Sequence, residues 1–228
     1  AGKIPPLPWT NLSPPFSQYP LLTEIVGGGP FELKAGQWTD DTSMALALAE
    51  SLLSCRGLEE TDLMNRFLDW HQTGAYSCNG KCFDIGNTTR DALMRFKETG
   101  DPVAGNTSTQ SAGNGSLMRL SPVVVRYFHD RPAMADAARR QSMVTHGATE
   151  AVDACIVFAD LLADALIGNS IDHLLAPRDV DASPAIVNIL GGNWRTKSRD
   201  QIQSSGYVVH SLEAAIWSVG NPAVHRRE

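Results

Sequence analysis

The segment ATEAVDACIVFADLLADALI, residues 148–167, is the longest periodic stretch of the chain. Its apolar residues recur at three- and four-residue intervals, at Val152, Cys155, Ile156, Ala159, Leu162, Ala163 and Leu166. This spacing places one apolar stripe along an α-helix. Asp160 and Asp164 interrupt the apolar run, so the segment is too polar for a membrane span. The segment therefore predicts a long helix that packs inside a soluble protein.

The same period recurs on both sides of this segment. We expect further helices from Thr39 to Leu52 and over residues 63–71, 88–97, 117–128, 132–141, 184–190 and 208–218. Pro122 and the valine triplet at 123–125 leave the type of the 117–128 element open. The alternation of polar and apolar residues that is typical of strands is nearly absent. The pattern predicts an all-α fold, a single compact helical bundle.

Length and composition favour one globular domain that follows a proline-rich arm. Of the 228 residues, 43% are hydrophobic and 19% are charged, which excludes a largely disordered chain and a coiled coil. Six of the first 20 residues are prolines, and proline favours extended and turn conformations over helix. We expect an arm over residues 1–20 and an all-α domain over residues 21–228.

Charge and cysteine content limit the partners and the compartment. The formal net charge is −6 and no block of Lys and Arg stands out, so nucleic acid is not an expected partner. Without a long apolar run or a visible secretory signal, we expect no membrane partner and a cytoplasmic location. The four cysteines are expected to be reduced thiols. Cys78 and Cys82 with His71 would lack a fourth zinc ligand.

Thr39-Asp40-Asp41-Thr42 stands at the start of the first expected helix. A hydroxyl or a carboxylate at this position caps the helix and interacts favourably with the positive end of its dipole. Two successive carboxylates flanked by threonines also form a cluster of hard oxygen ligands that suits Mg²⁺. From the residues alone, helix capping and a magnesium site both remain open.

Four more polar clusters stand near expected helix starts. They are Asp84-Ile85-Gly86-Asn87-Thr88-Thr89-Arg90, Gly113-Asn114-Gly115-Ser116, Thr145-His146-Gly147 and Ser205-Gly206-Tyr207. Glycines let a backbone approach a ligand closely, and N–H groups ahead of a helix bind phosphate. Arg119 would add a donor to the same ligand. Each cluster taken alone is also explained by caps, turns or packing, but together they indicate one cleft for an anionic ligand.

In this order, the clusters resemble the ADP-ribosylglycohydrolase family. The resemblance is carried by GQWTDDTSM (36–44), DIGNTT (84–89), GNGSLMR (113–119), TH (145–146) and SGYVVHSLEAA (205–215), and it extends over about residues 21–218. It implies an all-α fold with a binuclear Mg²⁺ site. The implied reaction is hydrolysis of the bond between the C1″ atom of ADP-ribose and an acceptor such as an arginine or serine side chain. The implied partner is ADP-ribose or an ADP-ribosylated protein.

The resemblance also implies a role for each matched residue. The metal ligands would be Thr39, Asp40 and Asp41, and the catalytic residues Asp40, Asp41 and Asp84, with Asp84 beside the substrate ribose. The substrate-binding residues would be Gly113, Asn114, Gly115 and Ser116 at the pyrophosphate and its ribose, His146 in the same cleft, and Tyr207 stacked on the adenine. Positive charge builds on the ribose carbon during cleavage, and nearby carboxylates stabilise it while metal ions activate a water.

Two segments of the family pattern have no counterpart in this sequence. The family begins with a helix that carries a Gly-Asp pair, where this chain has its proline-rich start. An Asp-x-Asp-Thr segment with the other half of the metal site should follow the Tyr207 helix, where this chain ends at Glu228. A chain shortened at both ends, a truncated relative without catalysis, and a partner chain that completes the site are three explanations. The alternative function is a catalytically impaired ADP-ribose-binding or structural, crystallin-like relative. Apolar faces that the missing helices would cover are expected to be exposed.

Overall fold

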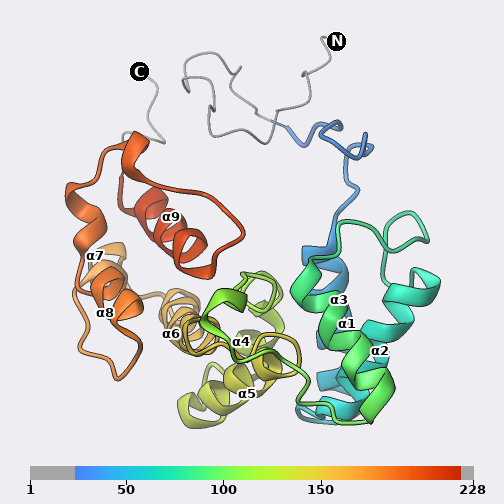
Figure 1. Cartoon of the computed structure of the whole chain (residues 1–228). Helices are drawn as coiled ribbons and strands as arrows, with labels where there is room; N and C mark the ends of the chain where they lie inside the picture. Colours follow the sequence, from blue (N-terminus) through green and yellow to red (C-terminus); the bar gives the residue numbers. More distant parts are fainter. Residues whose placement is uncertain (1–23, 222–228) are drawn as a thin grey trace.

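A computed structural model describes residues 24–221 of the chain, and the predicted arm over residues 1–20 lies outside them (Figure 1). The described part is helical, and it contains isolated backbone bridges but no β-strand. Its α-helices are α1 (Asp40–Ser54), α2 (Glu60–Thr73), α3 (Asn87–Thr99), α4 (Ser121–Tyr127), α5 (Arg131–Met143), α6 (Thr149–Leu166), α7 (Ile171–Leu175), α8 (Pro184–Leu190) and α9 (Val208–Gly220). The predicted all-α class is confirmed. Within this part, no helix has both the length and the apolar character of a membrane span.

Helix α6, the long helix that the sequence predicts, is the central element. It packs against α4, α5, α7, α8 and α9 (Figure 1). Its buried face carries small side chains, Ala151, Ala154, Cys155, Ala159 and Ala163. Because these side chains are short, the neighbouring helices can approach closely, and α5 presents its own buried alanines, Ala137 and Ala138. The apolar stripe of the sequence coincides with this buried face at Cys155, Ala159 and Ala163. The other members of the stripe are half-buried or, in the case of Leu166, exposed.

Helices α1, α2 and α3 form a second packed group, beside α4 (Figure 1). Their contacts are made by larger side chains than those of α6, and Met44, Leu48, Leu63, Phe67 and Leu93 are fully buried. Burying an apolar side chain of this size contributes roughly 1.5–3 kcal/mol. This packing fixes the start of α1 and the start of α3, the two places that carry the predicted acidic residues.

The C-terminal helices pack around tryptophans. Trp194 lies in a short 3-10 helix, η3 (Asn193–Thr196), between α8 and α9, and both it and Trp217 of α9 are buried. The indole Nε1 of Trp217 donates to the backbone oxygen of Lys197 at 2.9 Å. Gly220 lies so close to Trp194 that a Cβ there would be 2.4 Å from the indole ring. These contacts hold α9 in place, and Tyr207 is the N-cap residue just before this helix.

Two elements differ from the sequence prediction. The helix expected over residues 117–128 begins only at Ser121, because Pro122 is tolerated in the first turn of a helix and not further inside it. The cluster at 113–116 is therefore a turn five residues ahead of α4 and not a helix start. Helix α7 was not predicted, since five residues leave no periodic stripe to read.

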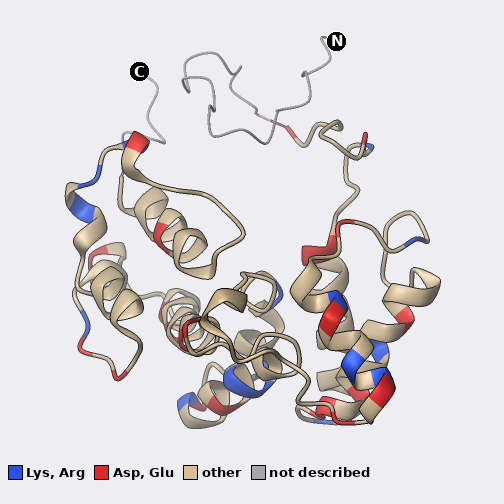
Figure 2. Cartoon of the chain, in the orientation of Figure 1, with Lys and Arg blue, Asp and Glu red and all other residues tan. Residues whose placement is uncertain are grey.

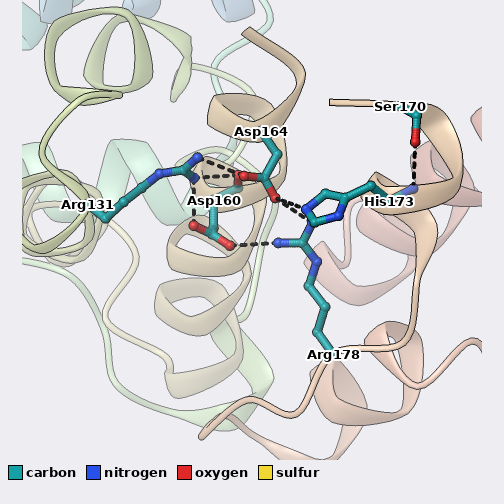
Figure 3. Close-up of polar contacts among 6 residues, drawn as sticks. All are labelled: Arg131, Asp160, Asp164, Ser170, His173 and Arg178. Carbon is teal, nitrogen blue, oxygen red and sulfur yellow. Dashed lines mark hydrogen bonds and ion pairs between the residues drawn. The ribbon is translucent and has the colours of Figure 1, made fainter. Parts of the chain in front are cut away.

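The two aspartates that interrupt the apolar run of α6 form an ion-pair network (Figure 3). Arg131 of α5 binds Asp160 and Asp164 with two N–O distances of 2.7 Å. Arg178, in the segment between α7 and α8, binds the other oxygens of both carboxylates, at 2.7 Å to Asp160 and 2.5 Å to Asp164. His173 of α7 lies 3.8 Å from Asp164. The network joins α5, α6 and the segment after α7.

Candidate functional site

The first part of the site is an acidic group at the starts of α1 and α3, formed by Asp40, Asp41 and Asp84. Figure 2 shows acidic residues at the start of α1. Asp40 is buried, and Thr39 is the N-cap residue of α1 without a capping side-chain hydrogen bond. Instead, the Thr39 hydroxyl donates to Oδ2 of Asp41 at 3.0 Å. Thr39 therefore orients a carboxylate rather than capping the helix.

The three carboxylates interact electrostatically. Burial, and then the charges of Asp41 and Asp84, raise the pKa of Asp40 to about 7. Burial and the charge of Asp41 also raise the pKa of Asp84, whose backbone is left-handed with a φ of 61°. Burial, with the charge of Asp40, raises the pKa of the Cys82 thiol to about 11. All these shifts oppose further negative charge, so the group favours binding of a cation.

This donor set matches one part of a magnesium site. Carboxylate and hydroxyl oxygens are the hard ligands that Mg²⁺ prefers, and Mg²⁺ is often held by one or two carboxylates while it keeps several waters. Asp40, Asp41 and the Thr39 hydroxyl provide such oxygens at one helix start. In residues 24–221, no group of three or more His, Cys, Asp or Glu side chains could hold a metal ion. The two-metal site stays a prediction.

The second part of the site is a groove of about 410 Å³ beside the acidic group. It is lined by Thr88, Thr109, Gln110, Ser111, Ala112, Gly113, Gly206 and Tyr207. Backbone hydrogen bonds close one side of it, from Asn114 to the Gly206 oxygen at 2.9 Å and from Val208 to the Ala112 oxygen at 3.0 Å. The first turn of α3 connects the two parts, because Thr88 lines the groove and Asp84 lies four residues before it.

The glycine turn at 113–116 lies against His146. A Cβ at Gly113 would be 3.2 Å from the His146 Nε2 atom, and a Cβ at Gly115 would be 3.0 Å from it. The turn therefore needs glycine so that the imidazole can approach. Of this turn, Gly113 lines the groove, whereas Gly115 and Ser116 are buried.

Two side chains of this turn are already engaged. Asn114 donates through Nδ2 to the Ser211 hydroxyl of α9 at 2.9 Å. Ser116 is fully buried, and its hydroxyl accepts from the Ser142 hydroxyl at 2.8 Å. Ser116 therefore has no exposed surface toward the groove, and Asn114 is held against α9.

Tyr207 lies at the edge of the groove and is held by two elements. Its hydroxyl donates to Oε2 of Glu150, in the first turn of α6, at 2.6 Å. Burial and this glutamate raise the pKa of Tyr207 to about 12. Its ring packs edge-on against His210 with 5.0 Å between ring centroids, and Ser205 lies 2.8 Å from the His210 Nδ1 atom. The ring is thus fixed before any ligand arrives.

His146 is positioned by its backbone as well as by its ring. Asn106 pairs with it in an isolated parallel bridge, next to a hydrogen bond from the Gly105 N–H to the Met143 oxygen at 2.9 Å. Gly105 and Gly147 make this approach possible, since a Cβ on Gly147 would lie 2.7 Å from the Gly105 oxygen. A larger residue at either position would push the two backbones apart.

The expectation that Arg119 contacts the ligand is wrong. Its side chain is fully buried, and it donates to Gln141 and Thr145 instead of reaching the groove. The physical reason is the late start of α4. Residues 115–119 form turns, and these direct Arg119 into the core over the ring of Phe67, 4.5 Å from its centroid.

The structure brings the remaining predicted residues into two adjoining groups. One group contains Thr39, Asp40, Asp41 and Asp84, and the other contains Gly113, Asn114, Gly115, Ser116, His146 and Tyr207. No role for Glu150 or for the Thr145 hydroxyl follows from the sequence. A glutamate in the first turn of a helix is typical of dipole compensation, so its contact with Tyr207, 57 positions away, left no signal in the sequence. All four cysteines are free, as expected.

Comparison with known proteins finds a matching family and similar relatives. The sequence matches the family described as ADP-ribosylglycohydrolase over residues 7–223. An ADP-ribosylarginine hydrolase Tri1 of Pseudomonas putida (strain GB-1) is 46% identical over 202 residues, which cover 88% of this chain and 54% of that protein. The protein of the same name from Serratia proteamaculans (strain 568) is 41% identical and is covered to 55% of its length. The chain therefore spans about half the length of these relatives.

A more distant relative and a solved structure agree with this match. An ADP-ribosyl-[dinitrogen reductase] glycohydrolase of Rhodospirillum rubrum is 28% identical over 201 residues, which cover 87% of this chain and 63% of that protein. A solved structure described as an ADP-ribosylglycohydrolase-related protein complex superimposes with a TM-score of 0.74 at 41% identity. That match covers 89% of this chain and 66% of the solved chain.

Proposed function

We propose, because this chain belongs to the ADP-ribosylglycohydrolase family, that it hydrolyses the glycosidic bond between ADP-ribose and an arginine side chain of a modified protein. The arginine acceptor is supported by the names of two relatives that are 46% and 41% identical to this chain. The four free thiols support a reducing compartment, the cytoplasm, as its location. Because the chain spans about half of each relative, activity of this chain is part of the proposal.

The observation that carries the proposal is the junction of the acidic group with the groove at the first turn of α3. A nucleotide sugar has an anionic pyrophosphate and an aromatic base at one end and a reactive sugar carbon at the other. The groove offers a close backbone approach at Gly113 for the anionic part and the fixed ring of Tyr207 for the base. The acidic group supplies carboxylates that suit a developing positive charge.

The carboxylates act on the ribose carbon in this proposal. Cleavage of a glycosidic bond gives that carbon positive charge in the transition state, and preorganised carboxylates stabilise it. Asp84 lies just before α3 and is the residue we assign to the ribose. Asp40 and Asp41 belong to the same acidic group. When bound, Mg²⁺ would orient the ribose hydroxyls and lower the pKa of a water. Thr39, Asp40 and Asp41 are the residues that would hold it.

The test is release of ADP-ribose from an ADP-ribosylarginine peptide, measured with Mg²⁺ and with EDTA. We expect release that depends on Mg²⁺, and a loss of roughly a hundredfold or more in the Asp40→Asn plus Asp41→Asn variant. Asp91→Asn is the matched control, since Asp91 is an exposed carboxylate on α3 outside the acidic group. Equal activity of the double variant and the wild type would contradict the proposal.

A second candidate function is ADP-ribose binding without hydrolysis. It is favoured by one observation, that Tyr207 and the glycine turn at the groove are held by contacts that do not involve the acidic group. Calorimetry with ADP-ribose separates the two candidates. Binding that does not require Mg²⁺, together with no release from the peptide, would select the binding protein over the hydrolase.

A further inference from the structure

Arg119 is a buried cation whose partners are all neutral. Its Nε donates to the Gln141 Oε1 at 3.0 Å, and its Nη2 donates to the Gln141 backbone oxygen at 2.7 Å. Nη2 also donates to the Thr145 hydroxyl at 2.8 Å. The side chain has no solvent exposure, and it forms no ion pair within residues 24–221. A charge held in this way at the end of a motif calls for an explanation other than stability, because burial of an unpaired charge is unfavourable.

The direction of the next hydrogen bond follows from the chemistry of the guanidinium. Arginine only donates, so the Thr145 oxygen accepts from Arg119. The same oxygen lies 2.8 Å from the His146 Nδ1 atom. Thr145 is fully buried, and no other acceptor for its hydroxyl hydrogen exists among the described residues. If Nδ1 carried a hydrogen, the hydroxyl hydrogen would be buried without a partner, which is unfavourable. The hydroxyl therefore donates to Nδ1.

The ring hydrogen must then be on Nε2. A neutral imidazole carries one N–H, and Nδ1 is already the acceptor. Nε2 lies against the Gly113–Gly115 turn and has no hydrogen-bond partner in the described part of the chain. Nε2 is not among the side-chain polar atoms that are fully enclosed and lack a hydrogen-bond partner, so part of its surface is accessible. The protonated ring is disfavoured as well, since burial and the charge of Arg119 lower the pKa of His146 to about 3.

We propose that Arg119, acting through Thr145, fixes His146 as the neutral tautomer with hydrogen on Nε2, and that this N–H donates to an oxygen atom of the bound nucleotide sugar. Arg119 and Thr145 are positioning residues, because they act on the ligand through the imidazole. The identity of the ligand rests on the proposed function, whereas the tautomer rests on the hydrogen bonds alone. Glycine at 113 and 115 leaves the donor uncovered.

The test is the tautomer of His146, read from nitrogen-15 chemical shifts of the histidine rings in the full chain. The signal is assigned by its loss in His146→Gln. We expect hydrogen on Nε2 in the wild type. Thr145→Val keeps the side-chain shape and removes the hydroxyl, and we expect it to yield a mixture of both tautomers. Thr145→Ser restores the hydroxyl, and we expect it to restore the Nε2–H tautomer. Thermal unfolding of each variant checks that it folds.

Two results would overturn the proposal: hydrogen on Nδ1 in the wild type, or an unchanged tautomer in a folded Thr145→Val protein. Calorimetry with ADP-ribose then measures the consequence for binding. We expect roughly tenfold weaker binding by Thr145→Val, the effect of one hydrogen bond, and recovery by Thr145→Ser. Absence of binding by the wild type would refute the proposed function, while the tautomer pattern would still support the role of Arg119 and Thr145.

Discussion

At the scale of the residue, His146 should make folding dependent on pH. Its pKa is about 3 in the folded chain, because of burial and Arg119, and near 6.5 when unfolded. Between these values the unfolded chain binds a proton that the folded chain does not, so stability falls as the pH decreases from about 6.5 towards 3. We expect a shallower fall in His146→Gln, measured as melting temperature by circular dichroism across this range.

The control for this measurement is His129→Gln, which removes an exposed histidine. Its melting temperature should follow that of the wild type across the same pH range. If His146→Gln and His129→Gln lose stability in parallel with the wild type, the ring of His146 is not held neutral in the folded chain.

Glu150 is a positioning residue for the ring of Tyr207. Its carboxylate accepts the Tyr207 hydroxyl at 2.6 Å, and removing it frees a ring that would otherwise be fixed before binding. We expect Glu150→Ala to weaken ADP-ribose binding by roughly threefold to tenfold. Glu150→Gln keeps an acceptor oxygen and should bind nearly as the wild type does. Equal affinities for all three proteins would exclude this role for Glu150.

The sequence predicts the members of the site better than their contacts. Residue type and order single out the acidic pair at 40–41, the glycine turn at 113–116 and Tyr207 as candidates, and the structure brings Gly113 and Tyr207 together. Their roles stay predictions. The direction of Arg119 was not predictable, since it depends on where α4 begins. Long-range supports such as that from Glu150 were not visible, because the two partners are far apart in the chain.

At the scale of the element, the ion pairs of Arg131 and Arg178 with the two aspartates of α6 hold this helix to α5 and to the segment after α7 (Figure 3). Arg178 contributes two contacts, to Asp160 and Asp164, from a segment without helical structure. We expect Arg178→Ala to lower the free energy of unfolding by about 1–2 kcal/mol, since the pairs are partly exposed. Urea unfolding at low salt measures this loss, which should shrink in 1 M NaCl as charges are screened.

Two substitutions give this prediction its controls. Arg178→Lys keeps the charge but cannot bind both carboxylates with one planar group, so it should recover only part of the loss. Arg199→Ala removes an exposed arginine of the C-terminal region and should leave stability within about 0.5 kcal/mol of the wild type. A loss as large in Arg199→Ala as in Arg178→Ala would contradict a specific contribution of the Arg178 ion pairs to stability.

Helices were predictable wherever the apolar period was long. The boundaries of α6 and α8 lie within one residue of those expected, because glycine, serine and proline mark their ends. The short α7 and the 3-10 helices have no such period, and α7 begins with a local cap, in which the Ser170 hydroxyl accepts from the His173 N–H at 3.2 Å. Local sequence therefore predicts the long helices, whereas a single cap residue is too weak a signal to predict a short one.

At the scale of the whole molecule, an apolar groove of about 440 Å³ lies between α1 and α4. Leu53 and Val125 at this groove have exposed fractions of 76% and 65%. Exposed apolar faces were expected from the sequence, and contiguous ones favour association. We expect the chain to self-associate as its concentration rises, and Leu53→Lys plus Val125→Lys to abolish the effect in sedimentation velocity. Leu166→Lys, an exposed leucine on α6, should not change it.

The run from Thr145 to Glu150 supports two rings, that of His146 against the glycine turn through a hydroxyl and that of Tyr207 at the groove through a carboxylate. Because one short backbone segment holds both rings, we expect binding of a ligand at one ring to change the affinity for a ligand at the other. AMP and ribose 5-phosphate, offered as separate fragments, should each bind severalfold more tightly in the presence of the other. Calorimetric titration of one fragment at saturating levels of the other measures this cooperativity, which Glu150→Ala should reduce.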